Sequence, residues 1–133
     1  MAAIKKIGIL TGGGDCPGLN AVIRAVVFKA GEYGWDVAGI KYGWKGMINA
    51  DTKPLTTDDV KGILSIGGTI LKTSRTNPFK VEGGSEKVIE NAKKMGIDCL
   101  VAVGGEDTLG VANKLTKMGF ACVGVPKTID NDL

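Results

Sequence analysis

Compact apolar runs recur along the chain, with the length and composition expected of buried β-strands. They cover residues 6–11, 36–41, 98–103 and 121–125. Longer stretches between them carry apolar residues at the spacing of amphipathic helices, as Val22, Val26 and Ala30 do in the first stretch. The helices are expected over residues 19–33, 85–95 and 108–118, with Ser85 as the N-cap of the second.

The middle of the chain gives weaker signals. Thr56 and Asp59 have the spacing of a capping box with Asp in the place of Glu, which predicts a short helix from there to about residue 64. Residues 42–53 read as irregular and residues 73–84 as a polar loop, whereas residues 69–72 are ambiguous.

Strand, glycine-containing loop and helix therefore alternate, which is typical of an α/β fold. We expect a doubly wound, mainly parallel sheet with helices on both faces. Ligands of such folds bind beyond the carboxyl ends of the strands. The loops after Thr11, Val103 and Val125 all lie at that edge, so we expect them to converge on one site.

Composition narrows the class of protein. A chain of 133 residues is enough for one compact domain. Its net charge of +3 is too small to argue for nucleic acid or a membrane surface, and no apolar stretch resembles a signal peptide or a membrane span. Three cysteines without a CxxC pair or any histidine do not favour zinc, and they predict reduced thiols in a cytoplasmic protein.

A glycine-rich loop, Gly12–Asn20, lies between the first strand and the first helix. Backbone amides at such a junction favour a bound phosphate. The loop lacks the Gly-Lys-Ser/Thr of a P-loop. Pro17 takes the place of the third glycine of a dinucleotide site, and Lys41 stands where a ribose-binding carboxylate would be expected, which argues against an oxidoreductase. Structural glycines in a tight turn are the alternative.

Charged residues follow the other strands. Glu106 and Asp107 open a predicted helix and suit Mg²⁺, although helix capping would explain them equally well. Arg75 is a candidate cation for a transferring phosphoryl group, or a solvated loop arginine. The loop from Pro126 to Asp132 combines carboxylates, an amide, a hydroxyl and an ammonium group, a set that can accept a proton from a sugar hydroxyl.

Four motifs in this order resemble the phosphofructokinase family. Gly-Gly-Asp-x-Pro-Gly-x-Asn is matched from Gly13, Gly-Gly-Thr followed by Ser-Arg ends at Arg75, and Gly-Gly-Glu ends at Glu106. Pro-x-Thr-Ile-Asp-Asn-Asp is matched from Pro126 to Asp132 and is very specific. Kinases of NAD or lipids are an alternative family. They have a loop similar to the third motif but lack the first and last motifs.

The resemblance implies a role for each matched residue. Asp130 would be the general base for the sugar 1-hydroxyl, with Lys127, Arg75 and Thr128 completing the catalytic set. Asp132 would join Thr128 and Asp130 in binding the sugar phosphate, and Glu106 would be the Mg²⁺-linked carboxylate. The donor would be bound by Gly13, Gly14, Arg75, Gly105, Asp107 and Thr108.

Two positions bear on the donor. ATP-dependent members typically have glycine where this chain has Asp107 and Lys127, and pyrophosphate-dependent members typically have Asp and Lys. Asp107 would repel the α-phosphate of ATP, by up to ~4 kcal/mol at ~4 Å and an effective dielectric of ~20. Lys127 would add a cation for pyrophosphate. The resemblance therefore favours pyrophosphate, with ATP as the alternative.

The family also implies what lies outside the chain. Its members are longer, so residues 1–133 correspond to a partial N-terminal, donor-binding lobe, and the second lobe, most sugar-phosphate contacts and the contacts of a homo-oligomer are absent. We expect a cytoplasmic, glycolytic enzyme that makes fructose 1,6-bisphosphate from fructose 6-phosphate. A truncated, non-catalytic phosphate-binding module is the alternative.

Overall fold

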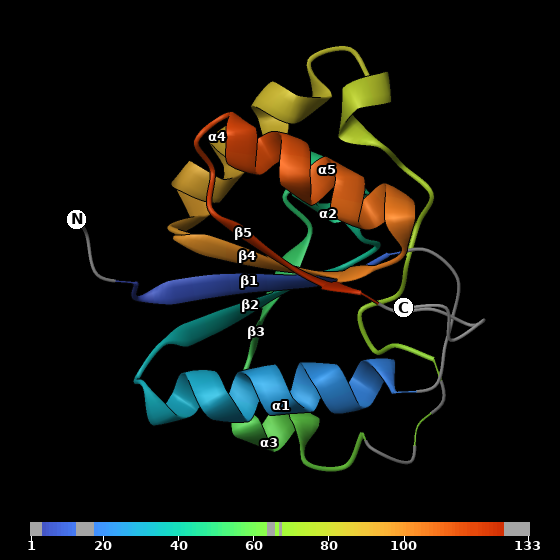
Figure 1. The fold of residues 1–133 in the computed structure, drawn as a ribbon. Coiled ribbons are helices and arrows are strands. Elements are labelled where there is room, and N and C mark those ends of the chain that lie inside the picture. The colour runs from blue at the N-terminus through green and yellow to red at the C-terminus, as the bar shows by residue number, and fades with distance from the viewer. Residues whose placement is uncertain (1–3, 13–17, 64–65, 67, 127–133) are drawn as a thin grey trace.

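A five-stranded sheet forms the centre of the molecule (Figure 1). The computed structural model describes residues 4–12, 18–63, 66 and 68–126. The strands are β1 (Lys6–Thr11), β2 (Asp36–Ile40), β3 (Thr52–Leu55), β4 (Cys99–Gly104) and β5 (Cys122–Pro126), in the order β3-β2-β1-β4-β5. All neighbouring strands are parallel except β2 and β3. The predicted doubly wound, mainly parallel α/β fold is confirmed.

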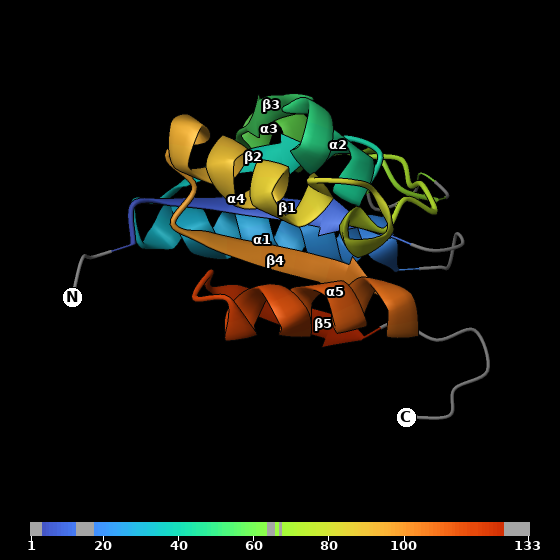
Figure 2. The same ribbon diagram turned by 90° about the horizontal axis from the view of Figure 1, so that it is seen from above.

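Helices cover both faces of this sheet. On one face lie α1 (Leu19–Glu32) and α3 (Thr57–Val60). On the other lie α2 (Trp44–Asn49), α4 (Gly84–Met95) and α5 (Glu106–Lys117), together with the short 3-10 turn η1 (Pro78–Lys80). Seen from above, α4 and α5 stand in front of the strands and α1 behind them (Figure 2). Parallel strands require such crossover helices, which explains why both faces are covered.

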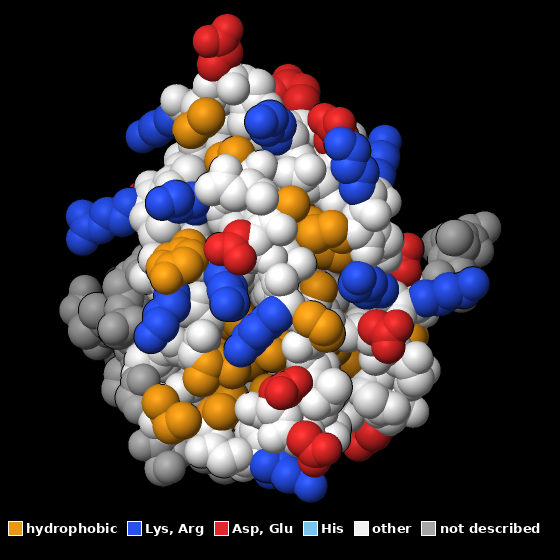
Figure 3. Space-filling model, turned by 180° about the vertical axis from the view of Figure 1, so that it is seen from behind, with side chains coloured by type: hydrophobic (Ala, Val, Ile, Leu, Met, Phe, Trp, Pro, Cys, Tyr) orange, Lys and Arg blue, Asp and Glu red, His pale blue; other side chains and the backbone are white. Residues whose placement is uncertain are grey.

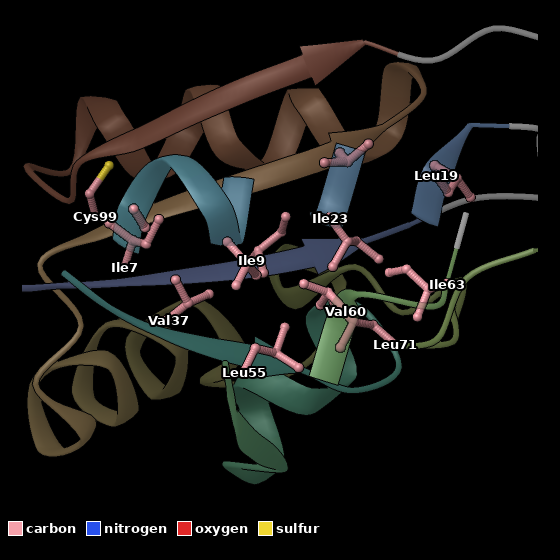
Figure 4. Packing of buried hydrophobic residues seen from close by; sticks show 13 residues of the cluster. Ile7, Ile9, Leu19, Ile23, Val37, Leu55, Val60, Ile63, Leu71 and Cys99 are labelled. Carbon is pink, nitrogen blue, oxygen red and sulfur yellow. The ribbon is translucent and has the colours of Figure 1, made fainter. Parts of the chain in front are cut away.

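Two hydrophobic clusters, one on each face, hold the layers together. The strand β1 supplies both, because its residues alternate between the faces. Ile7 and Ile9 pack with α1 and α3 in the cluster shown in Figure 4, and Leu10 packs with α2, α4 and α5. Five residues of β1, from Ile7 to Thr11, are buried, as expected for a central strand.

The segment 42–53 is where the prediction of irregular structure was wrong. It contains the whole of α2 and the start of β3. The strand β3 carries Pro54, which lacks a backbone N–H and therefore weakens the sequence signal for a strand, but β3 lies at the sheet edge where proline is tolerated. The helix α2 has only six residues, too few to show a helical period.

Helix boundaries differ in detail from those predicted. The capping box of Thr56 and Asp59 is confirmed, although α3 ends at Val60. The N-cap of α4 is Gly83, with φ of 67°, and not Ser85, which lies inside the helix and bonds Glu86. The helix α5 begins at Glu106, two residues earlier than predicted, so Glu106 and Asp107 lie in its first turn.

The surface opposite the view of Figure 1 carries basic and acidic side chains interspersed, with hydrophobic side chains between them (Figure 3). That mixture fits the small net charge of +3. Within the described parts of the chain, no helix has both the length and the apolar character needed to cross a bilayer.

Candidate active site

A cavity of about 520 Å³ lies between the segment that carries Arg75 and the start of the helix that follows β4. Of the three loops predicted to converge at the carboxyl ends of the strands, only the one after Val103 leads into residues that line it, among those the structure describes. The segment from residue 69 to 77 runs along this edge, from the layer of α1 and α3 to that of α4 and α5 (Figure 1). The lining residues are Trp44, Ser74, Arg75, Thr76, Asn77, Lys80, Val81, Asp107, Thr108 and Val111. Hydrogen-bond donors from Arg75, Lys80 and several hydroxyl and amide side chains in this lining suit an anion.

Arg75, Asp107 and Thr108 all line this cavity, as the resemblance implies for a donor site. Arg75 and Asp107 are exposed, so their charges face solvent and any ligand that enters. Gly105 and Glu106 directly precede Asp107 in the sequence but are not among the residues that line the cavity. The structure therefore brings together three of the five predicted site residues that it describes.

Thr108 is buried, and its side chain occupies the space above two glycines. A Cβ atom added at Gly104 would lie 2.6 Å from the Cβ of Thr108, and a side chain at Gly12 would also meet Thr108. The amide of Gly12 donates to the carbonyl of Val103 at 2.8 Å, which continues the pairing of β1 with β4 beyond the strand. These glycines therefore allow close packing of α5 against the strand ends.

The first turn of α5 carries the two carboxylates Glu106 and Asp107. The positive end of the helix dipole stabilises negative charge there, which is one part of the alternative explanation for these residues. The other part, helix capping, is not observed, because the N-cap is Gly105 and no side chain caps the helix. Among the described residues, no group of three or more Asp, Glu, Cys or His side chains could hold a metal ion. Two exposed carboxylates nonetheless fit Mg²⁺, which keeps several waters and shares phosphate oxygens of a substrate.

Two polar residues to which the sequence analysis gave no individual role hold the Arg75 segment in place. Asn20 is 3% exposed; its Nδ2 donates to the carbonyl of Ile66 at 2.8 Å, and its Oδ1 accepts from the amide of Ile70 at 2.9 Å. Thr11 is fully buried and bonds the same segment through its hydroxyl. Thr11 directly precedes the glycine-rich loop, and Asn20 is the last residue of the motif that begins at Gly13.

Burial disfavours the thiolate form of the two described cysteines. Cys99 and Cys122 are both free. Burial raises the pKa of Cys99 above its ordinary value, and burial followed by the neighbouring Cys99 raises the pKa of Cys122 to about 11. A thiol needs a lowered pKa to be reactive near neutral pH, so these side chains act as small apolar residues, as predicted.

The remaining predicted site residues lie outside the described part of the chain. They are Gly13, Gly14, Lys127, Thr128, Asp130 and Asp132.

Comparison with known proteins agrees with this geometry. The phosphofructokinase family model matches residues 6–133. The chain is 60% identical over 128 residues to a Dictyoglomus thermophilum protein named pyrophosphate–fructose 6-phosphate 1-phosphotransferase, covering 96% of this chain and 37% of that protein. It is 51% identical over 130 residues to the ATP-dependent 6-phosphofructokinase of Shouchella clausii, covering 98% of this chain and 41% of that protein.

Solved structures give the same result. The phosphofructokinase of Pichia pastoris in the T-state aligns with a TM-score of 0.87 and 34% identity, over 99% of this chain and 16% of that chain. The chain thus spans about two fifths of the length of the curated relatives it matches. With a family model that extends over nearly all of its residues, this chain belongs to the phosphofructokinase family.

Proposed function

We propose that the protein carrying this chain transfers a phosphoryl group from pyrophosphate to the 1-hydroxyl of fructose 6-phosphate, giving fructose 1,6-bisphosphate. The observation that carries the proposal is the cavity at the carboxyl edge of the sheet, where Arg75, Asp107 and Thr108 meet. The 60% identity to a protein named for this reaction supports it.

The charges around the cavity suit phosphoryl transfer, which depends on positioning and charge neutralisation more than on covalent chemistry. Arg75 offers a planar guanidinium for the oxygens of the transferring group. Lys80 is a second cation in the same lining. In this proposal Asp130 takes the proton of the attacking hydroxyl, and Lys127, Thr128 and Asp132 bind beside it, as the family resemblance implies.

Magnesium is part of the same proposal. Glu106 and Asp107, both exposed in the first turn of α5, would hold Mg²⁺ together with water and donor oxygens. When bound there, the ion would neutralise charge on the donor phosphates. Gly13, Gly14 and Gly105 would offer backbone amides to the same phosphates.

ATP is the second candidate donor, for two reasons. The chain is 51% identical to a protein named as an ATP-dependent enzyme, and a cavity of about 520 Å³ has room for more than a pyrophosphate. Asp107 favours pyrophosphate, because a carboxylate in the lining repels the extra phosphate of a nucleotide. We further propose that the enzyme acts in the cytoplasm, in glycolysis, as a homo-oligomer in which residues 1–133 form part of the N-terminal, donor-binding lobe.

The test is an assay of the complete natural protein with fructose 6-phosphate and Mg²⁺, offering pyrophosphate and ATP in separate reactions. Fructose 1,6-bisphosphate formed from pyrophosphate but not from ATP would support the proposal. Efficient product formation from ATP would overturn the choice of donor. A folded, complete protein that uses neither donor would point to a non-catalytic phosphate-binding module.

A further inference from the structure

A chain of three hydrogen bonds connects the end of β1 to the segment that leads to Arg75. The hydroxyl of Thr11 lies 2.9 Å from the hydroxyl of Thr69 and 3.1 Å from the carbonyl oxygen of Lys72. A carbonyl oxygen can only accept and a hydroxyl has one proton, so Thr11 donates to Lys72 and accepts from Thr69. Thr69 in turn accepts from the amide of Leu71 at 3.1 Å.

This chain of bonds fixes a turn that is otherwise unfavourable. Lys72 has a φ of 62°, in the left-handed region that a lysine seldom adopts. Such a conformation persists only where surrounding contacts impose it. Two hydrogen bonds supply those contacts. The Thr11 hydroxyl donates to the carbonyl of Lys72, and the amide of Lys72 donates to the backbone carbonyl of Thr69 at 3.3 Å.

The next residues are anchored to a second strand end. The amide of Tyr42, just after β2, donates to the carbonyl of Leu71 at 2.9 Å. The hydroxyl of Ser74 donates to the carbonyl of Tyr42 at 2.6 Å. Arg75 follows directly and lines the cavity. Its backbone is therefore tied to the sheet through the turn at Lys72 and through Ser74.

Apolar packing sets the depth of this segment but not its orientation. Leu71 is fully buried in the hydrophobic cluster on the α1 and α3 face of the sheet (Figure 4). It fills the space left by Gly39, where an added Cβ would lie 2.7 Å from a Leu71 methyl group. Hydrophobic contacts are non-directional, so the direction in which the chain leaves Leu71 depends on the hydrogen bonds.

The same segment is also tied to the far side of the glycine-rich loop. Thr11 precedes that loop, and Asn20 follows it in the first turn of α1. Asn20 bonds both Ile66 and Ile70 through its amide group. Both flanks of the loop that would bind donor phosphates are thus bonded to the segment that ends at Arg75.

We propose that Thr11 is a positioning residue for phosphoryl transfer, which acts by holding Arg75 at a fixed position relative to the end of β1. Thr11 itself has no exposed surface, so it acts through Thr69 and Lys72 and not by touching the substrate. This inference rests on the proposed function. Reacting groups must be placed within a fraction of an ångström, and a displacement of about 1 Å can cost about 100-fold in rate.

The test compares Thr11→Val with Thr11→Ser in the complete protein. Valine keeps the shape of threonine and removes the hydroxyl, whereas serine keeps the hydroxyl. We expect T11V to lower kcat by roughly 10- to 100-fold while KM for fructose 6-phosphate changes less than about threefold. T11S should recover kcat to within about threefold. The matched control is Thr116→Val on α5, which removes a hydroxyl bonded to the carbonyl of Ala112 at 3.0 Å and should leave kcat unchanged.

Wild-type kcat in T11V would overturn the inference. So would equal losses in T11V and T11S, since the methyl group and not the hydroxyl would then be responsible. If T11V does not fold, Thr69→Val removes the hydroxyl that bonds Thr11 and the amide of Leu71 and should lower kcat in the same direction, by a smaller factor because the bond from Thr11 to Lys72 remains. Crystal structures of the two variants test the positioning role even if the proposed function is wrong. The Cα of Arg75 should move relative to β1 by about 1 Å in T11V and stay in place in T11S. An unmoved Arg75 would refute the positioning role.

Discussion

The side chain of Thr108 lies directly over Gly104, so that a Cβ atom at residue 104 would stand 2.6 Å from the Thr108 Cβ. Thr108 is β-branched and has few alternative rotamers in a helix, so it cannot easily turn away. We expect Gly104→Ala to lower the free energy of unfolding by about 1–3 kcal/mol, because one extra methyl overpacks the junction of β4 and α5. Urea unfolding monitored by circular dichroism measures it.

The neighbouring Gly105→Ala is the matched control. A Cβ atom at Gly105 would meet nothing within 4 Å, and its φ of −86° is open to any residue. G105A should therefore be neutral or stabilise slightly, by up to about 1 kcal/mol, since alanine restricts the unfolded chain. Equal losses in the two variants would show that the packing of Thr108 is not the cause.

Removing the guanidinium of Arg75 should impair turnover strongly. We expect Arg75→Ala to lower kcat by about 10²–10³-fold, the usual cost of losing one preorganised group that stabilises transition-state charge. Arg75→Lys should recover only part of that loss, because an ammonium group cannot bind two oxygens in a plane. Steady-state kinetics of the complete protein measures both, with Lys61→Gln on α3 as the control for loss of a surface cation. Full activity in R75A would exclude Arg75 from the reaction.

Asp107 should discriminate between donors. Its carboxylate is exposed, so solvent screens much of its repulsion toward a nucleotide phosphate. We expect that repulsion to amount to about 1–2 kcal/mol. We therefore expect Asp107→Gly to raise kcat/KM for ATP relative to pyrophosphate by roughly 10-fold. Glu106→Gln tests whether loss of any carboxylate in this turn has the same effect. An unchanged ratio of kcat/KM for ATP to kcat/KM for pyrophosphate in D107G would show that another residue sets the donor preference.

The fold was largely predictable because its signals are local. Buried parallel strands such as β1 and β4 read as short apolar runs, and α1 shows a clear helical period. The helix α2 and the strand β3 were missed because their formation depends on tertiary contacts. Trp44 and Met47 of α2 become buried only against the rest of the molecule, and Pro54 is acceptable only at a sheet edge.

The candidate site was predictable where its residues belong to short sequence motifs. Arg75, Asp107 and Thr108 were found from motifs and do line one cavity. Thr11 and Asn20 were not given roles, because their partners lie between 46 and 61 residues away in sequence. A buried hydroxyl or amide cannot be told from an exposed one by sequence pattern when its partner is so distant.

Stability should depend on pH through Asp98, which precedes β4. Its Oδ2 accepts from the amide of Lys5 at 2.8 Å and from that of Lys6 at 3.0 Å, and these bonds hold the pKa of Asp98 below its ordinary value of 3.8. A lowered folded-state pKa adds stability that is fully present above the ordinary value and is lost as pH falls through the folded-state value.

Asp98→Asn should therefore lower the urea midpoint most between about pH 5 and 7, and the difference from wild type should shrink below about pH 4. Urea unfolding across this range measures it. Asp36→Asn, an equivalent change at the exposed start of β2, serves as the control. A difference that stays constant from pH 7 to pH 3 would mean that the ionised carboxylate is not what stabilises the fold.

The two described thiols should resist alkylation in the folded protein. Burial raises the pKa of Cys122 to about 11, so at pH 8 only about 0.1% of it would be thiolate, against about a quarter for an ordinary thiol of pKa near 8.5. In a Cys16→Ser background, iodoacetamide labelling of Cys122 should be slower by about two orders of magnitude in the native protein than in urea. Its rate should rise about tenfold per pH unit toward pH 11, because only the thiolate reacts. Mass spectrometry of the labelled peptides follows Cys99 and Cys122 separately. Native labelling of Cys122 at the rate seen in urea would show that the folded protein does not shield this thiol.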